Sequence, residues 1–119
     1  ATATVGYLPD FLNKVEKAKS SKGTKFIHVI APCPTGWGIP VSDTVEAARE
    51  IVDCGLWYLA EYENGEFTLN RDPKEFTSVE DYLKRQARFK HLTDEDIRVI
   101  IESRDKKWAH IRSHWKTKE

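Results

Sequence analysis

A nearly continuous apolar segment at residues 25–30 constrains the fold more than any other feature of this sequence. Its letters are KFIHVI, with Phe26, Ile27, Val29 and Ile30, and the segment ends at Ala31-Pro32. Such runs are typical of a strand buried on both faces, as in a parallel sheet. A short strand predicted at residues 1–5 and a helix from Pro9 precede it, so the chain should open with a strand–helix–strand unit.

Local signals place the remaining elements. Asp43 followed by Glu46 predicts a capped helix that Gly55 ends. Asn64-Gly65 predicts a tight hairpin turn between strands at 57–62 and 66–69. Ser78 and Thr93 are candidate caps of two further helices. The apolar positions are Phe11, Leu12, Val15 and Ala18 in the first helix; Val45, Ala48, Ile51 and Val52 in the second; and Ile97, Ile100, Ile101, Trp108 and Ile111 in the last. The third helix bears Val79, Tyr82, Leu83 and Gln86.

Composition excludes several classes of protein. The 119 residues include 19 basic and 19 acidic side chains, so no nucleic-acid partner is implied. There is no apolar run of about 18 residues and no secretory signal, so we expect no membrane partner and a cytoplasmic location. The chain lacks methionine and opens within a predicted strand, so we expect a piece of a longer polypeptide.

Cys33 is the first candidate for chemistry, because it lies between two prolines at the end of the predicted buried strand. Three roles remain open from the residues alone: a small buried residue in a turn, a nucleophile with His28 as its base, or a metal or iron–sulfur ligand. Cys54, the second of the two cysteines, lies late in a helix, and we expect it to be buried rather than joined in a disulfide.

The position of Cys33 favours a ligand site, since ligands of open α/β sheets bind beyond the carboxyl ends of the strands. Pro32 and Pro34 restrict the backbone on either side of the sulfur. Gly36 and Gly38 permit close backbone approach, and Trp37 could shield a site from water.

The segments FIHVIAPCPTGWGIP, GLWYLAEYENGEF and YLKRQARFKHL resemble the C-terminal part of the β subunit of 2-oxoacid:ferredoxin oxidoreductases, with pyruvate:ferredoxin oxidoreductases most similar. The most specific segments of this resemblance are the Pro-Cys-Pro-Thr-Gly-Trp loop and residues 86–92. Ala87 departs from the family pattern, in which we expect glycine.

The resemblance implies an α/β fold, namely the C-terminal portion of a three-layer, Rossmann-like domain that binds thiamine diphosphate, followed by a β-hairpin and a helical tail. Residues 1–70 would belong to that domain and residues 71–119 to a helical extension. Cys33 would be the fourth ligand of a 4Fe-4S cluster, and the amides of Gly36, Trp37 and Gly38 are candidates to donate to its sulfur.

The same resemblance implies an enzyme complex that oxidatively decarboxylates a 2-oxoacid, with pyruvate expected, and transfers the acyl group to coenzyme A and electrons to ferredoxin. The segment that would anchor thiamine diphosphate through Mg²⁺ has no match here, so we expect no catalytic residue and no turnover by this chain alone. The alternative is a small non-catalytic α/β interaction module in which the Pro-Cys-Pro loop is purely structural.

Two further features stay open at this level. The basic residues at 84–91 form a solvated face or dock an anionic partner or a neighbouring subunit. His110 and His114 have the i, i+4 spacing of metal ligands, although a helix surface explains them equally well. We expect the last helix to lie on a partner surface.

Overall fold

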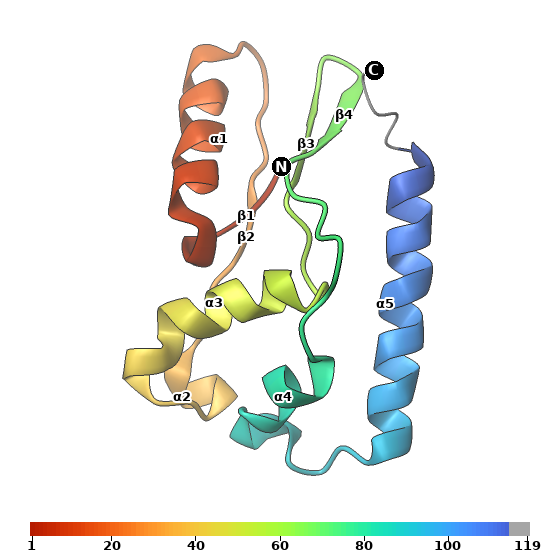
Figure 1. Cartoon of the computed structure of the whole chain (residues 1–119). Helices are drawn as coiled ribbons and strands as arrows, with labels where there is room; N and C mark the ends of the chain where they lie inside the picture. The colour runs from red at the N-terminus through yellow and green to blue at the C-terminus, as the bar shows by residue number, and fades with distance from the viewer. Residues whose placement is uncertain (115–119) are drawn as a thin grey trace.

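The computed structural model describes residues 1–114, and it begins with the predicted strand–helix–strand unit. Strand β1 (Thr2–Thr4) pairs in parallel with β2 (His28–Ile30), and helix α1 (Leu8–Ser20) connects them. Thr2 lies opposite His28 and Thr4 opposite Ile30 in the register. Figure 1 shows α1 and α5 on opposite sides of the strands. The structure therefore confirms a mixed α/β arrangement with small sheets.

Strand β2 is shorter and more exposed than predicted. It begins at His28 rather than at Lys25, and Phe26 is 76% exposed. None of its three residues is fully buried. The prediction of a strand buried on both faces is wrong for residues 1–114, where β2 pairs with β1 alone and its residues are exposed or half-buried.

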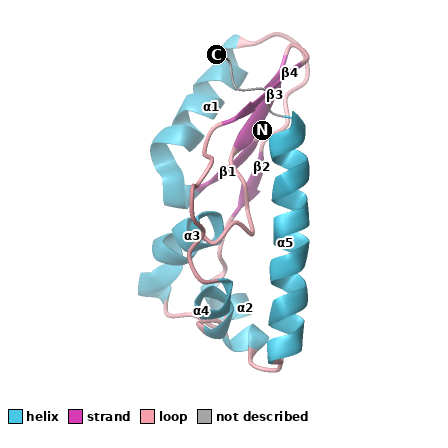
Figure 2. Ribbon diagram, turned by 45° about the vertical axis from the view of Figure 1, so that its right-hand side comes forward, coloured by secondary structure: helices cyan, strands magenta, loops and turns pink. Residues whose placement is uncertain are grey.

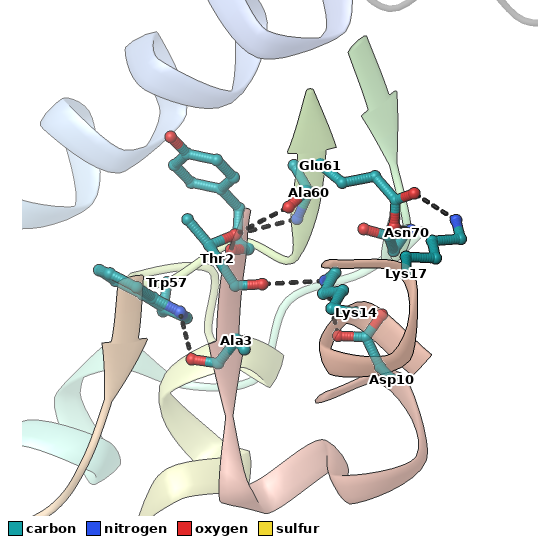
Figure 3. A network of polar contacts seen from close by, with 10 residues as sticks. Thr2, Ala3, Asp10, Lys14, Lys17, Trp57, Ala60, Glu61 and Asn70 are labelled. Carbon is teal, nitrogen blue, oxygen red and sulfur yellow. Dashed lines mark hydrogen bonds and ion pairs between the residues drawn. The ribbon is translucent and has the colours of Figure 1, made fainter. Parts of the chain in front are cut away.

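The one fully buried residue of α1 is polar. Lys14 is 3% exposed, and its ammonium donates to the Thr2 carbonyl at 2.9 Å and to the Asp10 carboxylate at 2.6 Å (Figure 3). The apolar residues Leu12 and Val15 are exposed at 56% and 41%. Of the four predicted apolar positions, Phe11 and Ala18 are half-buried. The helix therefore forms where predicted, and the Lys14 contacts to β1 and Asp10 add to a partly buried apolar side.

Helix α3 (Thr44–Asp53) supplies much of the core through Ala47, Ala48, Ile51 and Val52. Asp43 makes no side-chain cap bond, so the predicted capping box is wrong. A 3-10 turn, η2 (Val41–Asp43), leads directly into the helix and leaves Asp43 at φ −92° and ψ 1°, whereas a capping residue is usually extended. Val45 points outward and is 51% exposed, whereas Gly55 ends the helix at φ +80° as predicted.

The predicted hairpin is confirmed. Strands β3 (Ala60–Glu63) and β4 (Glu66–Leu69) pair antiparallel, and the turn residues Asn64 and Gly65 have φ of 52° and 83°. Two positive φ angles are the requirement of a type I′ turn. The first strand starts at Ala60 rather than at Trp57, because the Trp57 backbone amide donates to the Ile51 carbonyl of α3 at 3.0 Å. The Trp57 indole donates to the Ala3 carbonyl at 3.2 Å (Figure 3).

The two sheets are joined through a side chain of β1. The Thr2 hydroxyl donates to the Tyr58 carbonyl at 2.6 Å and accepts the Ala60 amide at 2.9 Å (Figure 3). Nearby, the buried Glu61 carboxylate is paired with the Lys17 ammonium and accepts the Asn70 amide at 3.0 Å. These contacts connect the hairpin to the strand–helix–strand unit.

The last three elements are α4 (Val79–Lys84), the 3-10 turn η3 (Ala87–Phe89) and α5 (Asp94–His114), which runs alongside the hairpin and α4 (Figure 2). The Ser78 and Thr93 caps are confirmed, since both side chains accept amides three residues ahead. Helix α5 packs on its own chain: Trp108 is 2% exposed and its indole donates to the Gly55 carbonyl at 2.8 Å. The expectation that its apolar face lies on a partner is therefore wrong.

The predicted boundary between residues 1–70 and 71–119 stays a prediction, and residues 115–119 of the second segment lie outside the described residues. Within residues 1–114, no helix combines the length and the apolar character needed to cross a membrane.

Candidate functional site

Cys33 is the residue that caps a single helical turn at the end of β2. The turn, α2 (Pro34–Trp37), begins with Pro34, whose fixed φ suits the first helical position. Cys33 itself is extended, at φ −107° and ψ 106°, and its sulfur accepts the Gly36 amide at 3.4 Å. The sequence predicted a loop here; the structure shows a short helical turn that places a backbone N–H against the sulfur.

The two cysteines have different environments, and both are free thiols. Cys33 is exposed, whereas Cys54 is fully buried and donates to the Ile51 carbonyl. Burial raises the pKa of the Cys54 thiol to about 11. Because the thiolate is the form that binds metals, Cys33 is the accessible ligand of the pair.

The three backbone amides that we expected near the Cys33 sulfur donate to different acceptors in the structure. The Gly36 amide donates to the Cys33 sulfur, but the Trp37 amide donates to the Cys33 carbonyl at 2.8 Å and the Gly38 amide to the Pro34 carbonyl at 2.9 Å. The last two bonds close the helical turn. Trp37 and Gly38 thus shape the turn, and Gly36 is the residue of the three whose amide reaches the sulfur.

Trp37 points into the core. Its side chain belongs to the main hydrophobic cluster, with Ile39 and Leu83, and the residue is 8% exposed. The guanidinium of Arg88 lies 4.0 Å from the centre of the Trp37 ring. The tryptophan therefore anchors the Cys33 turn to the body of the chain.

Residues 86–88 dock directly on the Cys33 turn. The Ala87 amide donates to the Gly38 carbonyl at 3.2 Å, and a Cβ built on Gly38 would lie 2.4 Å from the Cβ of Ala87. The two segments that carry the most specific resemblance are therefore in contact, although they are far apart in the sequence. The sequence alone did not predict this contact. The one hint was that these two segments carry the most specific parts of the resemblance.

The basic residues at 84–91 include several that pair within the chain. Lys84 is paired with Glu80, and Arg85 lies 3.2 Å from a Glu50 carboxylate oxygen. Burial raises the pKa of Glu50, although Arg85 opposes the shift. These contacts reduce the charge that the segment presents to a partner.

His110 and His114 lie side by side on α5, with ring centres 4.3 Å apart. A ring nitrogen of His114 lies 2.9 Å from the His110 carbonyl. Among residues 1–114, no group of three or more His, Cys, Asp or Glu side chains is arranged to hold a metal ion. The pair therefore stays an open feature of the helix surface.

The chemistry of Cys33 fits one ligand of an iron–sulfur cluster. Its sulfur is exposed, lies in a rigid proline-flanked turn and already accepts an N–H, the type of bond that stabilises cluster sulfur. Such a cluster takes four ligands, and the sequence contains two cysteines, of which one is buried. The other ligands would have to come from residues outside this chain.

Comparison with curated proteins shows which enzyme subunits this chain is similar to. The chain is 49% identical over 107 residues to the pyruvate synthase subunit PorB of Methanocaldococcus jannaschii, a match that covers 90% of this chain and 36% of the relative. It is 43% identical over 114 residues to the ketoisovalerate oxidoreductase subunit VorB of Pyrococcus abyssi, covering 94% of this chain and 37% of that subunit. No protein-family model matches.

These identities show that the chain is homologous, over nearly all of its length, to part of the pyruvate synthase and ketoisovalerate oxidoreductase subunits, as the resemblance predicted. It is similar to both PorB and VorB subunits, including PorB of Methanothermobacter thermautotrophicus at 43% identity over 112 residues. The chain spans a little over a third of the length of these curated relatives.

Proposed function

We propose that this chain is the C-terminal portion of the β subunit of a pyruvate (2-oxoacid):ferredoxin oxidoreductase, and that Cys33 is the fourth ligand of its 4Fe-4S cluster. The proposal rests on one observation: a chain 49% identical to a pyruvate synthase subunit presents an exposed cysteine that caps a proline-bounded turn. A buried or disulfide-bonded cysteine at this position would not support it.

The residues of the turn have distinct roles in this proposal. Cys33 binds iron as a thiolate, and the Gly36 amide, 3.4 Å from the sulfur, stabilises the negative charge. Pro34 starts the turn and Trp37 anchors it in the core. When bound, the cluster would carry single electrons from the oxidised 2-oxoacid to ferredoxin.

The remainder of the proposal concerns parts of the enzyme outside this chain. Residues 1–70 would complete the domain that binds thiamine diphosphate and Mg²⁺, and residues 71–119 would form its helical extension. Companion subunits would complete the enzyme. The assembled enzyme would then bind the 2-oxoacid and coenzyme A as substrates and pass electrons to ferredoxin. This chain supplies a ligand and a scaffold and no catalytic residue of its own.

The test uses the full-length subunit, assembled anaerobically with its companion subunits. Cys33→Ser should change or abolish the electron paramagnetic resonance (EPR) signal of one cluster, lower the iron content and impair ferredoxin reduction. Cys54→Ala is the matched control, because that thiol is buried, and it should retain full iron. Unchanged iron and unchanged ferredoxin reduction in Cys33→Ser would contradict the proposal.

A further inference from the structure

A chain of contacts connects the core of α4 with the Cys33 turn. Gln86 is 1% exposed, and its side-chain amide donates to the Tyr82 carbonyl at 3.0 Å. The Gln86 side-chain oxygen in turn accepts the Nε–H of Arg88 at 2.9 Å. Both groups of the glutamine are thus used, and the orientation of the Arg88 guanidinium is set from the protein interior.

The Arg88 guanidinium covers Trp37 and also lies 4.5 Å from the centre of the Phe89 ring. Arginine suits this position, because its planar group stacks on an aromatic face while its Nε–H remains available for a hydrogen bond. The stacked charge covers the outer side of an indole whose other surroundings are the main core cluster. Trp37 is therefore packed between the core and Arg88.

Trp37 is the last residue of the turn that Cys33 begins. Its amide donates to the Cys33 carbonyl at 2.8 Å, and the intervening Gly36 amide donates to the Cys33 sulfur. A movement of Trp37 out of its site would lengthen the first bond and turn the second amide away. The direction of the Cys33 sulfur thus depends on the seating of Trp37.

We propose that Arg88 is a positioning residue for the Cys33 sulfur, acting through Trp37, with Gln86 as the group that orients it. The role toward a cluster rests on the proposed function, whereas the effect on the turn does not. Arg88 does not itself bind the cluster in this proposal. It keeps the turn closed, so that the sulfur and the Gly36 N–H remain aligned.

The size of the effect follows from the strength of the contact. Arg88 is exposed on its outer side, and a cation–π contact at such a site contributes about 1 kcal/mol, equivalent to about a fivefold change in an equilibrium constant. Arg88→Ala should therefore open the turn about fivefold more often. Arg88→Lys keeps a cation near the ring and should restore part of the loss.

The experiment uses the full-length subunit in its assembled complex, with Arg88→Ala, Arg88→Lys and Arg112→Ala. Arg112 is a matched control, because its guanidinium also stacks on a buried tryptophan, 5.1 Å from the Trp108 ring, but on α5. Hydrogen exchange of a peptide covering residues 33–38 measures opening of the turn. The EPR line shape and the rate of iron loss to a chelator measure the effect on the cluster.

We expect Arg88→Ala to speed exchange of residues 33–38 and iron loss by about fivefold, to alter the EPR line shape, and to be partly rescued by Arg88→Lys. Arg112→Ala should leave all three unchanged. Equal exchange in Arg88→Ala and wild type would overturn the inference. A third outcome separates the two proposals. If Arg88→Ala speeds exchange but leaves iron loss and the EPR signal unchanged, and Cys33→Ser also keeps its cluster, the proposed function is overturned. The effect of Arg88 on the turn is then retained.

Discussion

The Ala87 amide donates to the Gly38 carbonyl at 3.2 Å, and Gly38 itself has φ +68°. A side chain at Gly38 would need a strained left-handed backbone and would meet the Ala87 methyl group at 2.4 Å. Glycine at position 38 is therefore required twice, once by the backbone and once by the neighbouring segment.

Gly38→Ala should lower the free energy of unfolding by about 3 kcal/mol, combining about 1 kcal/mol of backbone strain with about 2 kcal/mol of overpacking. Gly23→Ala is the control, because Gly23 also has positive φ, but a methyl group there would meet no atom of residues 1–114 within 4 Å, its chain neighbours aside. It should cost about 1 kcal/mol. Denaturant unfolding measures both.

The contribution of Ala87 can be separated by a double-mutant cycle. In an Ala87→Gly background, the cost of Gly38→Ala should fall toward that of Gly23→Ala, because the opposing methyl group is gone. Equal costs of Gly38→Ala in the two backgrounds would show that the Ala87 methyl group is not what excludes a side chain.

Trp108→Ala should destabilise the chain by about 4 kcal/mol, because the indole is 2% exposed and donates to the Gly55 carbonyl. Val99→Ala, on the exposed side of the same helix, should change stability by less than about 0.5 kcal/mol. Thermal or denaturant unfolding compares the two. Similar small effects would mean that α5 does not pack on this chain.

Stability should fall in acid because of Glu61. Burial pushes the pKa of Glu61 up, but hydrogen bonds from Lys17 and Asn70 outweigh it, so the pKa is lowered. A lowered folded-state pKa stabilises the fold above the ordinary value of about 4.3, and this stabilisation is lost as the pH falls through the lowered value. Glu61→Gln should reduce this loss, measured as the free energy of unfolding against pH; an identical acid-side slope would contradict the assignment.

The two thiols should react at very different rates in the metal-free chain. Iodoacetamide should modify the exposed Cys33 first, whereas Cys54 is buried and its pKa of about 11 leaves about one thiolate in a thousand at pH 8. Peptide mass spectrometry locates the label, and denaturant should make both cysteines reactive. Rapid native labelling of Cys54 would contradict its burial.

The elements that the sequence predicted well are those specified by neighbouring residues. Asn64-Gly65 determines the hairpin turn because these two residues tolerate positive φ, and Thr93 with Asp96 determines the start of α5 through reciprocal hydrogen bonds. The role of Cys33 as a cluster ligand stays a prediction, because the residues alone left three roles open and the resemblance favoured one of them.

Contacts between distant segments decided the rest. Helical spacing in α1 could not show that Lys14 would be buried and Leu12 exposed, because that choice depends on the Thr2 carbonyl across the βαβ unit. Likewise, a basic cluster read from sequence could not show that Arg88 stacks on Trp37. Local patterns determine backbone conformation, whereas burial and side-chain partners follow from which elements the folded chain brings together.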